Sequence, residues 1–357
     1  MSTTEGVIPP PEVLARWRRF AAASARPLGS GLINATFELR TPDGERAVLQ
    51  RLHPVFAAEV NLDIAVVTEH LAEQGLRTPR ILPTDDGALW VEAADGIWRA
   101  LSFVPGIVHQ RLTDPAMARE AGCLVGRFHA ALDGFDYDYR SGRSNVHDTP
   151  AHLQRLRLAL ERHAAHRLYG AVAPAAELLL REAERLVELE ALPLRHAHGD
   201  LKISNLLFDP AGSGLCLIDL DTLTRMHWPL EMGDALRSWC NPAREERQAA
   251  QLDLDLFQAA LGGYRESTAE LIMAPEWAAM VPGLARICLE LAARFLADAL
   301  NESYFGWDPQ HYGSRGEHNL ARGRAMWTLY RDVMEKRAEA ERVVKKVVVH
   351  TGKARML

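Results

Sequence analysis

A short segment near the middle of the chain carries side chains whose types and order could catalyse phosphoryl transfer. It runs from His196 to Asn205 and places Asp200 five residues before Asn205, and Asp219 follows after a predicted hairpin. Transfer from ATP needs a carboxylate that accepts the proton of the attacking hydroxyl, and oxygen ligands that hold Mg²⁺ against the phosphates. We predict that Asp200 is the catalytic base, and that Asn205 and Asp219 are the metal ligands.

The sequence between these residues predicts a hairpin that brings the metal-ligand candidates together. Residues 206–209 and 215–218 are apolar, as in two short strands, and residues 210–214 have the composition of a tight turn. The hairpin returns Asp219 close to Asn205, so that two oxygen ligands converge on a hard cation. A surface loop with solvated acids is the alternative, but it leaves the order of strand, turn and strand unexplained.

Composition limits the classes of protein that remain. A chain of 357 residues is long enough for two domains, and its formal net charge of −6 gives no reason to expect nucleic acid or anionic membranes as partners. No signal peptide and no membrane-spanning apolar run is apparent. We expect a cytoplasmic protein, monomeric or homodimeric, with four reduced core cysteines, which are Cys123, Cys216, Cys240 and Cys288.

The chain changes character near Pro105 and Gly106. Before this point, strand-like segments alternate with turns, and we expect strands at 33–40, 46–52, 82–92 and 96–104, and a helix at 61–74. Beyond it we expect helices at 117–132, 149–166, 173–189, 244–265, 275–300 and 319–341. Residues 345–357 are expected to form a frayed tail or a closing strand.

This arrangement predicts an α+β, protein-kinase-like bilobal fold. A small β-rich N-terminal lobe, residues 1–104, would bind the nucleotide. A larger, mainly helical C-terminal lobe, residues 105–357, would carry catalysis and acceptor binding.

Several N-terminal residues are candidates for contacts with ATP. Gly29 and Gly31 precede a strand and would let backbone N–H groups approach the phosphates, although a plain hairpin turn fits them too. Ser102, Phe103 and Val104 would form the hinge whose backbone binds adenine. The same three residues are equally compatible with a buried strand that ends in a turn.

The strand at 46–52 lacks the lysine that kinases use to hold the α- and β-phosphates. Gln50 or Arg51 occupies that position, and alternation along a strand lets only one of them point into the nucleotide site. Arg51 could supply the positive charge and is our candidate. Asp63 and Glu69 are both candidates for the acidic partner on the following helix.

The motifs resemble those of the aminoglycoside phosphotransferase and choline kinase superfamily, which has a protein-kinase-like fold. Further strings are similar to N-acetylhexosamine 1-kinases, and the resemblance runs from about residue 28 to about residue 335. These strings are 31–37, 48–52, 67–71, 218–222, 233–237, 294–298, 304–305 and 318–322. The resemblance implies a Mg²⁺- and ATP-dependent enzyme of carbohydrate metabolism that phosphorylates the anomeric hydroxyl of a 2-acetamido sugar. The resembled subfamily also has Gln-Arg at 50–51, so the absence of lysine does not imply inactivity.

Few residues in the sequence point to the acceptor-binding site. Candidates are Asn34, Tyr304, Arg315 and Arg322, whose aromatic, amide and arginine groups suit sugar hydroxyls but also ordinary packing. We expect Asp234 to orient the catalytic loop.

Other function classes stay open. An aminoglycoside phosphotransferase should have an acid-rich pocket for its polycationic acceptor, whereas the C-terminal segment mixes acids and bases. A metal phosphohydrolase would leave Asn205 and the glycine turn unexplained. A pseudokinase binding module agrees with the missing lysine but not with the presence of Asp200, Asn205 and Asp219.

Overall fold

The computed structural model describes residues 9–29, 34–141, 147–189, 191–243, 249–268 and 270–350. The chain forms two compact units, one of Met1–Pro105 with Asp136–Arg143 and the other of Gly106–Phe135 with Ser144–Leu357. The first is rich in strands and the second in helices, so the predicted α+β class is confirmed. Within the described ranges, no helix is both long and apolar enough to cross a membrane.

An antiparallel sheet forms the centre of the first unit. Over its described residues the order is β1-β2-β3-β6-β4, and β5 also pairs with β6. The strands are β1 (Ser24–Pro27), β2 (Ala35–Arg40), β3 (Arg46–Arg51), β4 (Ile81–Leu82), β5 (Val91–Ala93) and β6 (Gly96–Ser102).

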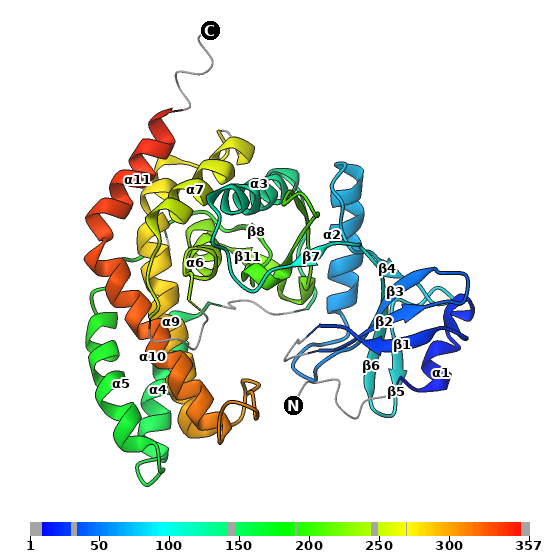
Figure 1. The fold of residues 1–357 in the computed structure, drawn as a ribbon, viewed down its shortest axis with the longest axis horizontal. Coiled ribbons are helices and arrows are strands. Elements are labelled where there is room, and N and C mark those ends of the chain that lie inside the picture. Colours follow the sequence, from blue (N-terminus) through cyan, green and yellow to red (C-terminus); the bar gives the residue numbers. More distant parts are fainter. Residues whose placement is uncertain are drawn as a thin grey trace. The chain divides into compact units, whose positions relative to one another are not determined.

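The two faces of this sheet differ because side chains alternate along each strand. One face carries Phe37 and Trp98 and packs with Trp17, next to α1 (Pro11–Leu14), in the apolar core of the unit. Figure 1 shows α1 and α2 (Val60–Glu73) on opposite sides of the sheet. The face toward α2 is therefore the one that carries polar side chains from the strand interiors.

Helices dominate the second unit. The long helix α9 packs against α10, α6, α4 and α5, and α10 runs beside it in Figure 1. The helices are α3 (Pro115–Ala131), α4 (Thr149–Arg162), α5 (Tyr169–Ala183), α6 (Trp228–Trp239), α7 (Leu254–Thr268), α8 (Ala274–Ala278), α9 (Met280–Asn301), α10 (Arg315–Glu335) and α11 (Arg337–His350).

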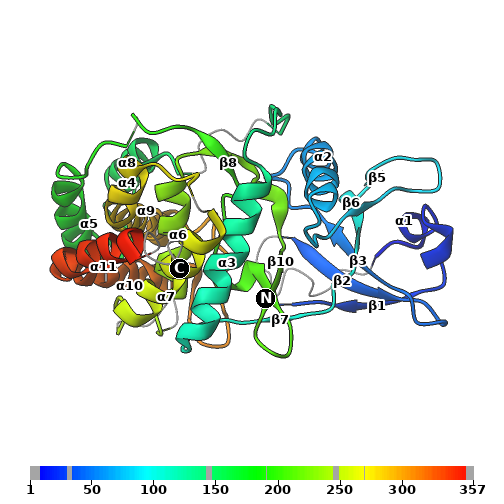
Figure 2. The same ribbon diagram turned by 90° about the horizontal axis from the view of Figure 1, so that it is seen from above.

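Helices α3 and α7 pack closely because glycine lies at their contact. A Cβ atom on Gly122 would lie 2.0 Å from the carbonyl oxygen of Ala260, and one on Gly263 would lie 2.0 Å from that of Arg119. Side chains at these positions would force the helices apart. This packing places α3 beside strand β10, as Figure 2 shows.

Two small sheets interrupt the helices and carry the catalytic segment. In the described part of the unit, β7 (Ile107–Val108), β9 (Leu206–Phe208) and β10 (Gly214–Leu217) form one, and β8 (Arg195–Ala197) pairs with β11 (Thr224–Met226) in the other. The hairpin predicted around residues 210–214 is confirmed.

Some predicted boundaries are wrong. The strand expected at 82–92 is the pair β4 and β5 with a turn between them. The helix expected at 275–300 is α8 and α9, which part at Ala279. The helix expected at 319–341 begins at Arg315 and is divided at Lys336 into α10 and α11.

Two further expectations concern segments next to residues outside the described ranges. The helix expected from residue 244 begins at Leu254, because Asp253 accepts hydrogen bonds from the N–H groups of Asp255 and Leu256 at its start; residues 244–248 lie outside the description. The frayed tail expected from residue 345 is helical as far as His350, and residues 351–357 lie outside the described ranges.

Candidate functional site

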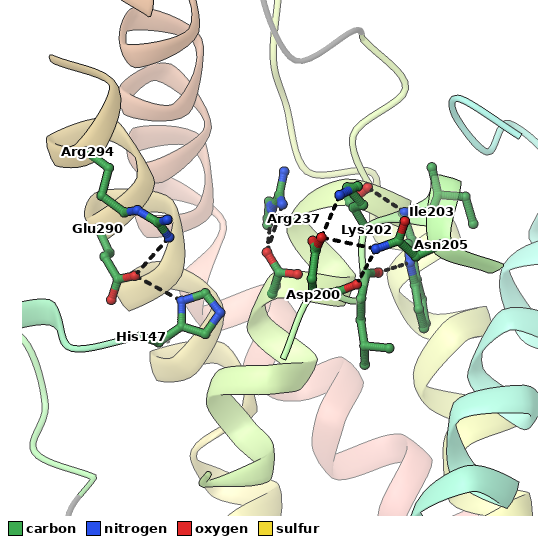
Figure 3. Close-up of polar contacts among 12 residues, drawn as sticks. His147, Asp200, Lys202, Ile203, Asn205, Arg237, Glu290 and Arg294 are labelled. Atoms are coloured by element: carbon green, nitrogen blue, oxygen red, sulfur yellow. Dashed lines mark hydrogen bonds and ion pairs between the residues drawn. The ribbon is translucent and has the colours of Figure 1, made fainter. Parts of the chain in front are cut away.

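Asp200 lies in the loop after β8 with two of its sequence neighbours against its carboxylate. Lys202 Nζ lies 2.5 Å from Asp200 Oδ2, and Asn205 Nδ2 donates to the same oxygen at 3.0 Å (Figure 3). Asn205 Nδ2 also donates to the backbone oxygen of Asp200 at 2.9 Å. The five-residue spacing thus folds into one compact loop with both side chains in contact.

The hairpin brings Asp219 to the same place. The backbone N–H of Ile218 donates to the carbonyl of Asn205 at 2.9 Å, which fixes Asp219 beside the loop. Lys202 Nζ lies 4.0 Å from Asp219 Oδ2, so one ammonium group lies near both carboxylates. The structure therefore brings Asp200, Asn205 and Asp219 together, as predicted from their spacing.

Asp219 has an unusual backbone conformation. Its φ is 64° and its ψ is 54°, in the left-handed region that side chains other than glycine, asparagine and aspartate seldom adopt. Such strain is concentrated at functional sites, where it aims a side chain that regular geometry would direct elsewhere.

Charges around the loop set the protonation states. Burial alone would raise the pKa of Asp200, but Lys202 lowers this pKa to about 2. Burial would likewise lower the pKa of Lys202, yet the carboxylates of Asp200 and Asp219 raise it above its ordinary value. At neutral pH the site therefore holds an ionised Asp200 that can accept a hydrogen bond from a hydroxyl group.

The oxygens around Asp219 suit a hard divalent cation. Burial and the neighbouring carboxylates of Asp221 and Asp200 raise the pKa of Asp219, a repulsion that a cation would relieve. The amide oxygen of Asn205 accepts no hydrogen bond from the described residues. No group of three histidine, cysteine or acidic side chains suited to a metal occurs in the described ranges, but Mg²⁺ is often held by only one or two carboxylates together with phosphates.

A buried glutamate on α6 holds the start of the loop, and sequence analysis missed it. Glu231 Oε1 accepts hydrogen bonds from the backbone N–H groups of His198 at 2.5 Å and Gly199 at 3.0 Å. Glu231 Oε2 lies 2.7 Å from His129 Nε2, and His129 Nδ1 lies 2.7 Å from the Tyr264 hydroxyl. Burial alone would raise the pKa of Glu231, but His129 and the Gly199 N–H lower it.

Glycine is required at position 199. Its φ is +84°, and a Cβ atom there would lie 2.4 Å from the carbonyl oxygen of Thr222. The adjacent His198 is structural, because its Nε2 lies 2.9 Å from the carbonyl oxygen of Ile218 and its Nδ1 receives the Asp200 N–H at 3.3 Å. Both residues fix the path of the backbone into Asp200.

In the first unit, only part of the predicted nucleotide site falls within the described residues. Gly29 has a φ of +75° with open space around its Cα, whereas Gly31 lies outside the described ranges. Ser102 ends β6, and its Oγ accepts the Arg80 N–H at 2.9 Å. Phe103 and Val104 follow β6, and the Arg46 guanidinium lies 3.6 Å from the centre of the Phe103 ring.

Gln50 and Arg51 lie on opposite faces of β3, as alternation predicts. Gln50 Oε1 accepts from Arg99 Nε at 2.9 Å and Nη2 at 2.7 Å, and Arg99 also reaches the Asn61 oxygen on α2 at 3.4 Å. Arg51 instead pairs with Asp95 at 3.3 Å. The positive charge on the α2 face thus comes from Arg99, a fully buried residue that sequence analysis did not consider.

The two candidate acidic partners on α2 have other roles. Asp63 accepts hydrogen bonds from the Tyr137 hydroxyl at 2.7 Å and from the N–H groups of Arg140 and Ser141. Glu69 pairs with Arg80. The hydrogen bonds that Arg99 donates to Gln50 and Asn61 take the place of the predicted acid–base pair.

The predicted acceptor residues have different surroundings. Asn34, in the first unit, accepts the His53 N–H at 2.9 Å. Tyr304 is exposed, whereas Arg322 is buried and donates to the carbonyl of Gly306 at 2.9 Å. Arg315 begins α10, and its role, like that of the other three, stays a prediction.

Asp234 does not orient the catalytic loop as expected. Its Oδ1 accepts from Arg237 Nε at 3.0 Å and Nη2 at 2.8 Å, one turn along α6. No hydrogen bond joins it to the loop within the described residues. The orienting acid is Glu231, three residues earlier on the same helix.

A family model described as phosphotransferase enzyme family matches residues 24–271, which is more than half of the chain. An uncharacterized protein of Deinococcus radiodurans is 27% identical over 290 residues, covering 74% of this chain and 78% of the relative.

Solved structures share the fold. An aminoglycoside phosphotransferase from Alicyclobacillus acidocaldarius has a TM-score of 0.59 at 18% identity, over 96% of this chain and 97% of the other. A microcompartment-associated aminopropanol kinase has a TM-score of 0.60 at 18% identity, over 93% and 97%. The amicoumacin kinase hAmiN, in complex with AMP-PNP, Ca²⁺ and Ami, has 0.60 at 15%, over 89% and 95%. With the fold shared and more than half of its length matched by the family model, the chain belongs to the phosphotransferase enzyme family.

Proposed function

We propose that this protein transfers the γ-phosphoryl group of Mg²⁺-bound ATP to the anomeric hydroxyl of an N-acetylhexosamine. The hydroxyl oxygen forms a bond to the γ-phosphorus, the bond from that phosphorus to the ADP oxygen breaks, and the proton passes to Asp200. The products are ADP and the sugar 1-phosphate. The observation that carries this proposal is the compact set of Asp200, Lys202, Asn205 and Asp219 in one unit.

Asp200 is suited to orient the acceptor more than to act as a strong base. A carboxylate whose pKa is about 2 stays ionised at neutral pH and accepts a hydrogen bond from the attacking hydroxyl. Lys202, held at 2.5 Å, is placed to balance negative charge near the transferred group. The two side chains thereby prepare the acceptor without a separate proton carrier.

Asn205 and Asp219 would hold Mg²⁺ through the amide oxygen and the carboxylate. A divalent ion held there would supply positive charge that neutralises the charge developing on the transferred phosphoryl group. The hAmiN complex with AMP-PNP and Ca²⁺ supports nucleotide and divalent-ion binding by this fold. In the first unit, Gly29, Gly31 and the residues 102–104 are assigned to the nucleotide.

The acceptor is assigned to neutral amino sugars on two grounds. The first ground is the set of sequence strings that are similar to N-acetylhexosamine kinases. The second is that two buried acids, on α6 and α9, already have basic partners. Glu290 pairs with His147 and Arg294, and Asp234 pairs with Arg237. A polycationic aminoglycoside would need acids whose charge is not already balanced by a basic partner, and each of these two acids has such a partner.

The test is to incubate the purified protein with Mg²⁺ and ATP and with each of N-acetylglucosamine, N-acetylgalactosamine, glucose, choline and kanamycin. Phosphate would be located by ³¹P NMR, and we expect an anomeric phosphate on an acetamido sugar. Phosphorylation of kanamycin alone would replace the proposal with antibiotic modification. ATP binding without transfer to any acceptor would favour a pseudokinase.

A further inference from the structure

A chain of buried charges extends from the catalytic loop toward α9. In Figure 3, Arg237 of α6 lies beside Asp200, on the side toward the group formed by His147, Glu290 and Arg294. Arg237 contributes to the low pKa of Asp200, and Asp234 acts electrostatically on both Lys202 and His147. The charges of this cluster therefore influence the pKa values of Asp200 and Lys202.

Glu290 is fully satisfied within the cluster. Its Oε1 lies 2.9 Å from His147 Nδ1 and 3.8 Å from an Arg294 nitrogen, and its Oε2 accepts from Thr149 Oγ1 at 2.7 Å. Burial would raise the pKa of Glu290, but His147 lowers it to about 2. Glu290 thus acts as a fixed anchor for His147 and has no free oxygen for a ligand.

Asp234 has an oxygen that is not satisfied. Both hydrogen bonds from Arg237 go to Oδ1, whereas Oδ2 receives none from any described residue. The side chain is only 4% exposed, so bulk water does not compensate. Because a buried carboxylate oxygen without a donor is costly, this atom needs a hydroxyl or another donor from a ligand.

His147 offers the complementary group. Its Nδ1 is bound to Glu290, and its Nε2 makes no hydrogen bond to the described residues. Although burial alone would lower the pKa of His147, Glu290 raises this pKa above its ordinary value and so favours the protonated ring, in which Nε2 also carries a hydrogen. In Figure 3 the ring lies on the side of Glu290 toward Asp200 and Arg237.

We propose that Asp234 Oδ2 and His147 Nε2–H form a positioning subsite for the acceptor, one accepting and one donating a hydrogen bond. This inference rests on the proposed function. This subsite selects a neutral ring that carries a hydroxyl group near an amide carbonyl. The hydroxyl donates a hydrogen bond to Asp234, and the carbonyl oxygen accepts one from His147. A 2-acetamido sugar has both groups on neighbouring carbons.

Two variants test the subsite with little change of shape. Asp234→Asn keeps an oxygen for Arg237 but puts an NH₂ group where Oδ2 accepts. His147→Asn keeps an amide nitrogen at the position of Nδ1, for Glu290, and removes Nε2. Asp332→Asn is the matched control, because it breaks the 2.9 Å ion pair between Asp332 of α10 and Lys336, outside the cluster.

The measurements are KM for N-acetylglucosamine, KM for ATP and kcat. We expect each cluster variant to raise the sugar KM on the order of 10- to 100-fold, since a hydrogen bond to a charged group is lost. KM for ATP should stay within about twofold in these variants, and Asp332→Asn should change neither KM. With glucose, which lacks the acetamido group, His147→Asn should have the same sugar KM as wild type.

The outcomes separate the two proposals. If wild type phosphorylates the sugar and both cluster variants keep its KM, the subsite is wrong and the proposed function stands. If wild type phosphorylates no sugar, the proposed function is wrong and the subsite falls with it. Thermal unfolding identifies a variant that does not fold; in that case the other variant and the glucose comparison decide.

Discussion

Glu231 of α6 accepts the backbone N–H of Gly199 at 3.0 Å, and so fixes the catalytic loop from a helix that begins 29 residues later. The same carboxylate oxygen takes the His198 N–H, while the other oxygen is held by His129. The ring of His129 is in turn stacked on Trp228 at 4.4 Å. The position of Asp200 thus depends on a buried network of side chains from α3 and α6.

We predict that Glu231→Gln lowers kcat on the order of 10-fold with little change in KM for ATP. The amide keeps the size of the side chain but weakens charge-assisted bonds to the loop and to His129, at a cost of about 1–3 kcal/mol of stability. Coupled-assay kinetics and thermal unfolding would measure both effects. Glu276→Gln is the control: Glu276 is equally buried and bound to Arg195, so it should lose stability and keep kcat.

Local spacing predicted the parts of the site that fold locally. The distance from Asp200 to Asn205 and the hairpin to Asp219 involve neighbouring residues, so turn chemistry and alternation are enough. Helix ends were harder to predict: α8 and α9 form one continuous apolar pattern, and only the structure shows that they part at Ala279.

Groups joined by tertiary pairing could not be predicted. Glu231 and His198 are 33 residues apart, and Gln50 and Arg99 are 49 residues apart on strands whose pairing no local pattern specifies. One signal was present for Glu231, because an acid among the apolar residues of a buried helix needs a partner. No comparable signal marked Arg99.

Asp200→Asn should retain nucleotide binding and lose transfer. The amide cannot accept the acceptor's proton, and general-base contributions are on the order of 10²–10⁴ in rate. Kinetics with the best acceptor, together with calorimetry of AMP-PNP binding, would measure the two properties. Turnover near that of wild type would remove Asp200 from this role.

Asp219 can be probed by three variants that separate charge from backbone strain. Asp219→Asn, Asp219→Ala and Asp219→Gly should all weaken the Mg²⁺ dependence of nucleotide binding, because each removes the carboxylate ligand. Since alanine tolerates the left-handed region less well than asparagine or glycine, Asp219→Ala should be less stable than the other two, by about 1 kcal/mol. Calorimetry with and without Mg²⁺ is the measurement, and an unchanged Mg²⁺ dependence would point to Asp221 instead.

Substitutions of Gln50 and Arg51, which are neighbours on β3, would identify the group that replaces the phosphate-binding lysine. We expect Gln50→Ala to raise KM for ATP on the order of 10-fold, because it leaves Arg99 without its two hydrogen bonds on the α2 face. Arg51→Ala, on the opposite face, should stay within about twofold. The reverse result would assign the role to Arg51, as the sequence suggested.

The His147–Glu290 pair should make stability depend on pH at both ends. Glu290, with a pKa lowered from 4.5 to about 2, stabilises the folded state above pH 4.5, and this contribution is lost as pH falls toward 2. His147, with a pKa raised above 6.5, stabilises below pH 6.5, and its contribution is lost as pH rises through the folded-state value. The pair therefore stabilises most between pH 4.5 and pH 6.5. Accordingly, the difference in melting temperature between wild type and His147→Asn should be largest in that window and shrink as pH rises through the folded-state pKa of His147, whereas Asp332→Asn should show no such maximum. A difference that does not vary from pH 5 to pH 9 would mean that His147 carries no charge in the fold, and would remove the Nε2–H cation from the acceptor subsite.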